Sequence, residues 1–318
     1  MERKLKDTIL KSGIPLEVSV VDKLSEYGFD DQGEITYERE GKLFSTDIKA
    51  DREIFHKSGL PFDLVLSIEC KFRTPEHDWF FMRFPRESRF GFRHDTGLIS
   101  FRDYIRRVKE NSSDELEGIN FGRFVNFLEC EEVDKGVEII KNRDFDHSAI
   151  RKCISQSIFG ALKAQEEALR YNTDIMAEGL AEQEWQDDIE SQFFYGAIGS
   201  LTLPIVVTTA DLYKMKDGLR LEDVKSSDDP ENLFEKVKFV KYKKAEAEEA
   251  SQFTEKLLSR ENLSCYDEMD RIREAYPKEM ELSRLPDIRP SSPIYFVDYE
   301  HLDEFLENLE ETIEDVEG

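Results

Sequence analysis

The sequence predicts an α/β protein in which a mixed central sheet is flanked by helices. Three observations support this: an unbroken apolar run at residues 64–72, a long amphipathic pattern at 148–171 and a second apolar run at 203–209. Short apolar runs without alternation are typical of strands that are covered on both faces, and apolar residues at helical spacing predict a helix. The predicted order is αβββ, an insertion, and then αββ.

A helix is expected at about residues 15–27, because Pro15 suits a first helical turn and Gly28 suits the position after the last one. Alternating residues 34–38, the turn-forming Glu40-Gly41-Lys42 and the strand pattern Leu43–Ile48 then predict a hairpin. The apolar run at 64–72 is the third strand.

The later elements are less regular. Residues 73–147 are interpreted as an insertion, with strand-like pieces at Trp79–Phe84 and Phe121–Cys130. Ser148–Tyr171 predicts a helix with one apolar face, followed by strands at 203–209 and 237–242. We therefore expect a core domain over residues 1–245 and an acidic, α-rich C-terminal appendage over 246–318, which contains one short strand at Ile294–Val297.

The composition is that of a folded protein, with 39% hydrophobic and 36% charged residues among 318. No apolar run has the roughly 18–20 residues that cross a bilayer, and Met1–Lys11 does not have the pattern of a signal peptide. A soluble, cytoplasmic protein without a membrane partner is expected. The four cysteines form no CxxC pair, so neither a disulfide framework nor a thiolate zinc site is indicated.

The net charge of −26 argues against nucleic acid as a partner, but the charge is unevenly distributed. Residues 1–110 hold 20 Lys and Arg against 21 Asp and Glu, whereas the remaining residues hold 24 against 49. Residues 83–109 carry a surplus of five positive charges interleaved with aromatic residues, a pattern that suits contact with phosphates and bases. A structural core with a solvated basic face explains the same pattern equally well. The candidate nucleic-acid-binding residues are Arg83, Arg86, Arg89 and Arg93.

Candidate catalytic residues lie on the first helix and on two strands. Side chains alternate along a strand, so Glu69 and Lys71 project from one face of the third strand and Cys70 from the other. Asp47 interrupts the preceding β-prone segment, and Glu17 shares a helix face with apolar residues. Carboxylates that converge on a divalent cation, with a nearby group that positions water, are the requirements of metal-assisted phosphodiester cleavage.

These residues, together with the αβββαβ order, resemble the PD-(D/E)XK, or restriction-endonuclease-like, nucleases. The resemblance covers residues 1–72 and, loosely, 148–210. It implies that Asp47, Glu69 and the backbone carbonyl of Cys70 bind Mg²⁺ or Mn²⁺, that Lys71 orients the attacking water and that Glu17 assists the metal site. Thr46 stands where the family name has proline, which leaves Asp51 and Asp63 as rivals for the acidic position.

The function implied is a Mg²⁺-dependent nuclease, an endodeoxyribonuclease above all, acting on DNA in restriction, defence or repair. The alternative is a catalytically silent protein of the same fold that binds nucleic acid or a protein partner, which includes a second copy of this chain. Gln156, on the helix after the third strand, resembles a polar residue near the active site in some members. It is interpreted more simply as a solvated glutamine.

Overall fold

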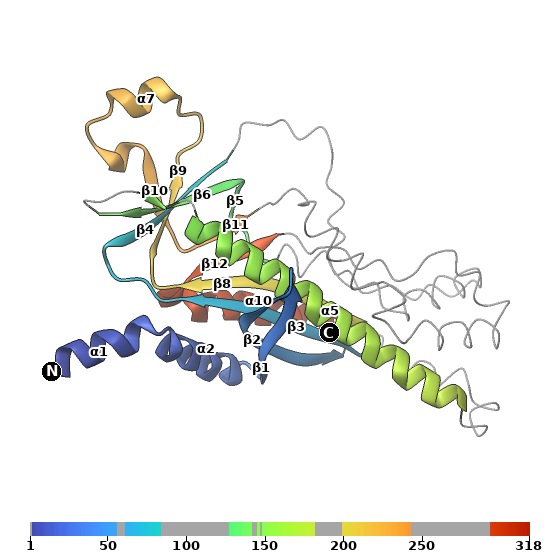
Figure 1. Cartoon of the computed structure of the whole chain (residues 1–318). Helices are drawn as coiled ribbons and strands as arrows, with labels where there is room; N and C mark the ends of the chain where they lie inside the picture. Colours follow the sequence, from blue (N-terminus) through green and yellow to red (C-terminus); the bar gives the residue numbers. More distant parts are fainter. Residues whose placement is uncertain are drawn as a thin grey trace.

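A computed structural model describes residues 2–55, 61–83, 127–141, 145–146, 148–181, 199–242 and 293–318. In these residues the chain is a mixed α/β protein with two mixed sheets and flanking helices (Figure 1). None of the helices in the described ranges is long and apolar enough to cross a membrane.

The larger sheet has seven strands in the order β1-β2-β3-β8-β12-β11-β5. Neighbours β1, β2 and β3 pair antiparallel, β3 pairs parallel with β8, and β8 pairs parallel with β12. The antiparallel partner of β12 is β11, which pairs parallel with β5. The strands are β1 (Asp30–Arg39), β2 (Lys42–Phe55), β3 (Pro61–Lys71), β5 (Glu131–Val133), β8 (Gly199–Thr208), β11 (Phe239–Tyr242) and β12 (Ile294–Asp298).

The smaller sheet has five strands in the order β10-β9-β4-β6-β7. Their bounds are β4 (His77–Met82), β6 (Lys135–Ile140), β7 (Phe145–Asp146), β9 (Asp211–Met215) and β10 (Phe234–Val237). The region interpreted as an insertion therefore supplies strands to both sheets, because hydrogen bonds join β4 to β9 and β5 to β11. Of the predicted strand Phe121–Cys130, residues 127–130 are irregular and the others lie outside the described ranges.

Helices cover both faces of the larger sheet. These are α2 (Ile14–Glu26), α5 (Ser148–Ala181) and α10 (Leu302–Glu317), whereas α1 (Glu2–Lys11) packs against α2 and α7 (Leu221–Ser226) follows β9 of the smaller sheet. On one face, Leu24 of α2 and Phe305 of α10 belong to the same buried cluster as Leu66 of β3. On the other face, α5 crosses the first strands, where Ala164 packs with Val65 (Figure 1).

Of the predicted appendage at residues 246–318, residues 293–318 are part of the core, and residues 246–292 lie outside the described ranges. Strand β12 lies between β8 and β11, and Tyr295 and Phe296 are fully buried. Helix α10 covers the sheet with a buried apolar face, and its Glu310 accepts a hydrogen bond of 2.5 Å from Arg52 of β2. The predicted boundary near residue 245 therefore does not separate residues 294–318 from the N-terminal strands.

The predicted elements of the N-terminal half are present with small changes of boundary. Helix α2, the β1–β2 hairpin, β3, α5 and β8 follow one another in the expected order. The hairpin turns at Glu40 and Gly41, both of which have positive φ, as a two-residue turn of type I′ requires. Among the described elements, the predicted strand 237–242 is divided between β10 and β11, which belong to different sheets.

Candidate active site

The pairing of β2 with β3 ends immediately before the predicted site. The last residue pair of this ladder is Ile48 with Ile68, so Asp47 and Glu69 lie just beyond it. On the other side of β2, Gly33 pairs with Lys49 and Ile35 pairs with Thr46, which leaves one extra residue in β2. Such a bulge changes the direction of a side chain without ending the strand.

The bulge accounts for the position of Asp47. Its Oδ2 accepts a hydrogen bond of 2.7 Å from the backbone N–H of Cys70, in place of a main-chain partner on β2. The C=O of a strand residue points to the same side as its N–H, so the Cys70 carbonyl is also directed toward β2. The carboxylate of Asp47 and this carbonyl therefore lie at the same edge of β3.

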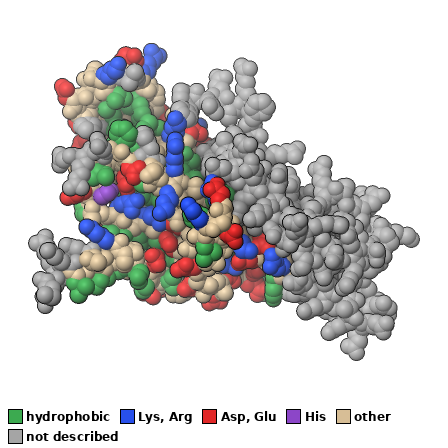
Figure 2. Space-filling model, viewed as in Figure 1, with side chains coloured by type: hydrophobic (Ala, Val, Ile, Leu, Met, Phe, Trp, Pro, Cys, Tyr) green, Lys and Arg blue, Asp and Glu red, His purple; other side chains and the backbone are tan. Residues whose placement is uncertain are grey.

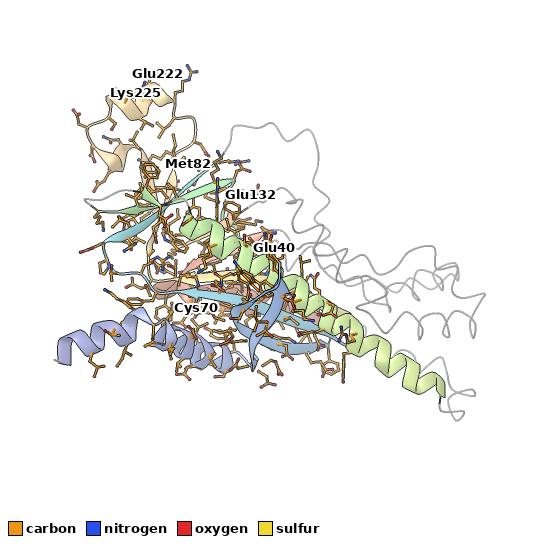
Figure 3. All side chains as sticks on the ribbon, viewed as in Figure 1. Glu40, Cys70, Met82, Glu132, Glu222 and Lys225 are labelled. Carbon is orange, nitrogen blue, oxygen red and sulfur yellow. The ribbon has the colours of Figure 1, made fainter. Side chains whose placement is uncertain are left out.

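Glu69 and Lys71 complete the centre of the site. Lys71 donates a hydrogen bond to Oε1 of Glu69, and its Nζ lies 3.9 Å from Oδ2 of Asp47. Glu69 is fully buried, and its Oε2 has no hydrogen-bond partner. Figure 3 labels Cys70 at this end of β3, where side chains occupy the space between the strand and the neighbouring helices.

Burial dominates the electrostatics of the two central carboxyls. Loss of solvent raises the pKa of Glu69 to about 7, with Lys71 acting against this shift and Asp47 adding to it. The pKa of Asp47 is also raised by burial, although Lys71 and the Cys70 N–H lower it. Burial alone would lower the pKa of Lys71, but its attraction to Glu69 and Asp47 is stronger, so this pKa is raised. Lys71 is therefore a cation at neutral pH.

Glu17 of α2 lies at the edge of the same group. Desolvation raises its pKa first, followed by repulsion from Asp47 and from Glu34 of β1, while Lys71 lowers it. These interactions place Glu17 near Asp47 and Lys71. Glu34 was not identified from the sequence, because a glutamate in a strand of alternating residues does not indicate a functional role. The bulge in β2 brings Glu34 opposite Asp47.

The donor set fits a hard divalent cation. Among the described residues no cluster of three or more His, Cys, Asp or Glu side chains is arranged to hold a metal ion. Mg²⁺ needs fewer, since one or two carboxylates usually suffice together with waters and substrate phosphates. Asp47, Glu69 and the Cys70 carbonyl could supply only oxygen atoms, and Oε2 of Glu69 is buried without a hydrogen-bond partner.

Helix α5 fixes the backbone beside Asp47. The hydroxyl of Thr46, in the position of the missing proline, donates a 2.8 Å hydrogen bond to the Gln156 carbonyl. The Gln156 amide donates to the Ser45 carbonyl at 3.1 Å, and its Oε1 is buried without a partner. The interpretation of Gln156 as a solvated residue was therefore wrong. Hydrophobic periodicity does not reveal that this turn of α5 contacts β2.

The rival acids are too far away to replace Asp47. Asp63 precedes Glu69 by six residues on β3, or roughly 20 Å along the strand. Asp51 pairs with Val65, four residues from Glu69. Neither side chain can share a metal with Glu69.

The predicted basic surface is only partly described. Arg83 is exposed just after β4, whereas Arg86, Arg89 and Arg93 lie outside the described residues. A cation that the sequence reasoning missed is Lys152 of α5, which lowers the pKa of both Asp47 and Glu69. Lys152 lies in the first turns of the helix that packs over β3, and this position was the feature of the sequence that could have indicated it.

Comparison of the chain with protein-family models, with curated proteins and with solved structures gave no match. A function can therefore be inferred only from the geometry and chemistry of the site.

Proposed function

We propose that the chain is a metal-dependent nuclease of the PD-(D/E)XK type, which hydrolyses phosphodiester bonds with DNA as the favoured substrate. The observation that carries the proposal is the convergence of Asp47, Glu69 and Lys71 where the β2–β3 ladder stops. The order α2-β1-β2-β3-α5-β8 supports it, because the restriction-endonuclease-like core has the same order of helices and strands.

The electrostatic balance favours a cation at this point. Two largely buried carboxylates, Asp47 and Glu69, share the single ammonium group of Lys71, and Glu17 adds a further negative charge nearby. Buried carboxylates are costly unless they are paired or bind a metal. An ordinary structural ion pair would satisfy both oxygens of Glu69, whereas here one oxygen is left without a partner.

Each residue then has a distinct role. Asp47, Glu69 and the Cys70 carbonyl would hold the cation, which when bound polarises the phosphodiester and lowers the pKa of water. Lys71 orients the attacking water by donating hydrogen bonds, and its raised pKa prevents it from acting as a general base. Glu17 lies farther out, where it can accept hydrogen bonds from water.

The test is cleavage of labelled DNA and RNA, single- and double-stranded, by the full chain with Mg²⁺ or Mn²⁺ and with excess chelator. We expect chelation, Asp47→Asn, Glu69→Gln and Lys71→Ala each to reduce cleavage by at least about a hundredfold. Asp63→Asn is the matched control, because it removes a part-buried carboxylate from the same strand and face as Glu69 but outside the site.

Cleavage that persists in chelator, or in the Glu69→Gln protein, would contradict the proposal. Binding of nucleic acid without cleavage under any metal condition would instead favour the catalytically silent alternative.

A further inference from the structure

A pocket of about 260 Å³ opens next to the candidate active site, between the β1–β2 hairpin and the first turns of α5. Figure 3 labels Glu40 at the tip of this hairpin, close to α5. The pocket is lined by Tyr37, Arg39, Phe44, Arg151, Lys152, Ser155, Gln156 and Phe159.

The lining is positively charged in a strongly acidic chain. Arg39, Arg151 and Lys152 contribute three cations, and the lining contains no acidic side chain. Arg39 lies 3.7 Å from the exposed Glu40 just outside the pocket, and its guanidinium lies over the Phe159 ring. Figure 2 shows Lys and Arg side chains gathered around the first turns of α5 on this face. The pocket therefore suits an anionic group.

The lining also offers aromatic surface. Tyr37 and Phe159 are buried at the base, whereas Phe44 is 37% exposed and lies nearly parallel to Tyr37, with ring centroids 5.9 Å apart. An exposed ring that is held by a neighbouring ring is a ready stacking surface for a base. Gln156 adds an Oε1 that is buried without a hydrogen-bond partner and can accept from a base N–H.

The pocket is continuous with the site through two residues of α5. Gln156 binds Ser45 and Thr46, which directly precede Asp47. Lys152 acts electrostatically on both Asp47 and Glu69. The pocket therefore adjoins the segment of β2 that carries Asp47.

We propose that this pocket binds one unpaired nucleotide, the base against Phe44 and the phosphate against Arg151 and Lys152, so that the substrate is single-stranded where it enters. The proposal rests on the proposed function and adds a substrate class to it. The volume of about 260 Å³, near the ~300 Å³ lower end of small-molecule sites, limits the pocket to one nucleotide or part of it and leaves no room for a base pair.

Binding is measured in chelator, where no cleavage occurs, by fluorescence anisotropy with labelled single-stranded DNA, single-stranded RNA and duplex DNA of the same sequence. We expect either single strand to bind more tightly than the duplex, and the ratio of the two single strands shows which sugar is preferred. Phe44→Ala should weaken single-strand binding about fivefold to hundredfold, because a stacking surface is lost. Phe55→Ala, which removes an exposed ring at the other end of β2, should change nothing.

The charge contribution has its own control. Arg151→Gln with Lys152→Gln should lower the slope of log affinity against log salt by about 0.7, the value for the one phosphate that the two side chains would hold on a single strand. Lys216→Gln with Lys225→Gln, which neutralises two lysines near α7, should leave the slope unchanged.

The two proposals fail in different ways. If the wild-type chain cleaves with Mg²⁺ but Phe44→Ala binds single strands as well as Phe55→Ala does, the pocket assignment is wrong and the nuclease assignment stands. If no cleavage is found but Phe44→Ala alone loses binding, the pocket stands and the nuclease assignment falls. Equal binding of duplex and single strands, or no binding at low salt, would overturn the pocket assignment.

Discussion

Gly160 of α5 controls how closely the helix approaches the strand that carries Asp47. A Cβ atom built on this glycine would lie 2.0 Å from Oγ1 and 2.8 Å from Cβ of Thr46, and 3.0 Å from Oγ of Ser67. Real Cβ atoms essentially never approach other heavy atoms this closely, and two of these three atoms belong to a short, fully buried side chain. Gly160→Ala must therefore move α5 or β2.

Two opposing effects set the size of the change. Helix propensity alone predicts that alanine stabilises the interior of α5 by about 1 kcal/mol. Overpacking costs about 1–3 kcal/mol, and loss of the hydrogen bond from Thr46 to the Gln156 carbonyl costs about 0.5–1.5 kcal/mol more. The expected net result is a free energy of unfolding that is lower by about 0.5–3.5 kcal/mol. The assay is urea unfolding followed by far-UV circular dichroism.

A double-mutant cycle separates this contact from a general effect on the helix. Thr46→Ala removes the nearest atom, so Gly160→Ala should be less damaging in the Thr46→Ala background, with a coupling of about 1 kcal/mol. The rate of cleavage should fall by more than the loss of folded protein explains, because the displaced backbone positions Asp47. A Gly160→Ala protein that is as stable as wild type or more stable would refute the reasoning.

Two further predictions concern the core. Burial, then Asp51 and Glu53, raise the pKa of Asp63 to about 6, so its ionisation destabilises the fold progressively between about pH 4 and pH 6 and by a constant amount at higher pH. Asp63→Asn should increase the free energy of unfolding at pH 8 by about 1–2 kcal/mol, which is roughly half the full linkage value because the group is partly solvated. Urea titrations should show that this gain vanishes near pH 4. A gain that is independent of pH would contradict this. Deletion of residues 293–318 should abolish cooperative unfolding in calorimetry, since β12 lies inside the sheet; a folded truncated chain would restore the interpretation as an appendage.

Local patterns were sufficient for the elements whose identity depends on their own residues. Helix α2 has Pro15 at its start and Gly28, with positive φ, after its end, and both features are visible in the sequence. The β1–β2 turn at Glu40 and Gly41 is equally local. These elements are stabilised by contacts within a few positions, which is the range that periodicity can report.

Strand neighbours were not predictable in the same way. The segment Ile294–Val297 has a strand signal, but nothing in it specifies pairing with β8, whose residues lie about 90 positions earlier. The strands of residues 73–147 are short, and their partners β9 and β11 follow much later in the chain. Pairing over such distances is decided by burial of whole sheet faces, so a region with weak local signals was interpreted as an insertion.

In the candidate site, too, local features were predictable and long-range ones were not. The shared face of Glu69 and Lys71 follows from the period of two along β3 and was predicted. The direction of Asp47 depends on a bulge, which period counting cannot detect, and the proximity of Lys152 depends on where α5 crosses the sheet. The sequence therefore indicated the residue types of the site, whereas their convergence required the fold.

The burial of Glu69 distinguishes a structural from a catalytic role for the acidic cluster. If this carboxylate serves the fold, Glu69→Gln should unfold the protein, because removing one partner of a buried ion pair leaves the other uncompensated at a cost of about 3–5 kcal/mol. The environment of Glu69 argues otherwise: burial raises its pKa to about 7, and Lys71 retains Asp47 at 3.9 Å as a second anion. A neutral side chain should therefore be tolerated, with stability unchanged or higher above pH 7, while cleavage is lost. A buried carboxylate whose ionised form opposes folding is the expected feature of a metal ligand, because the cation compensates its charge only when it is bound.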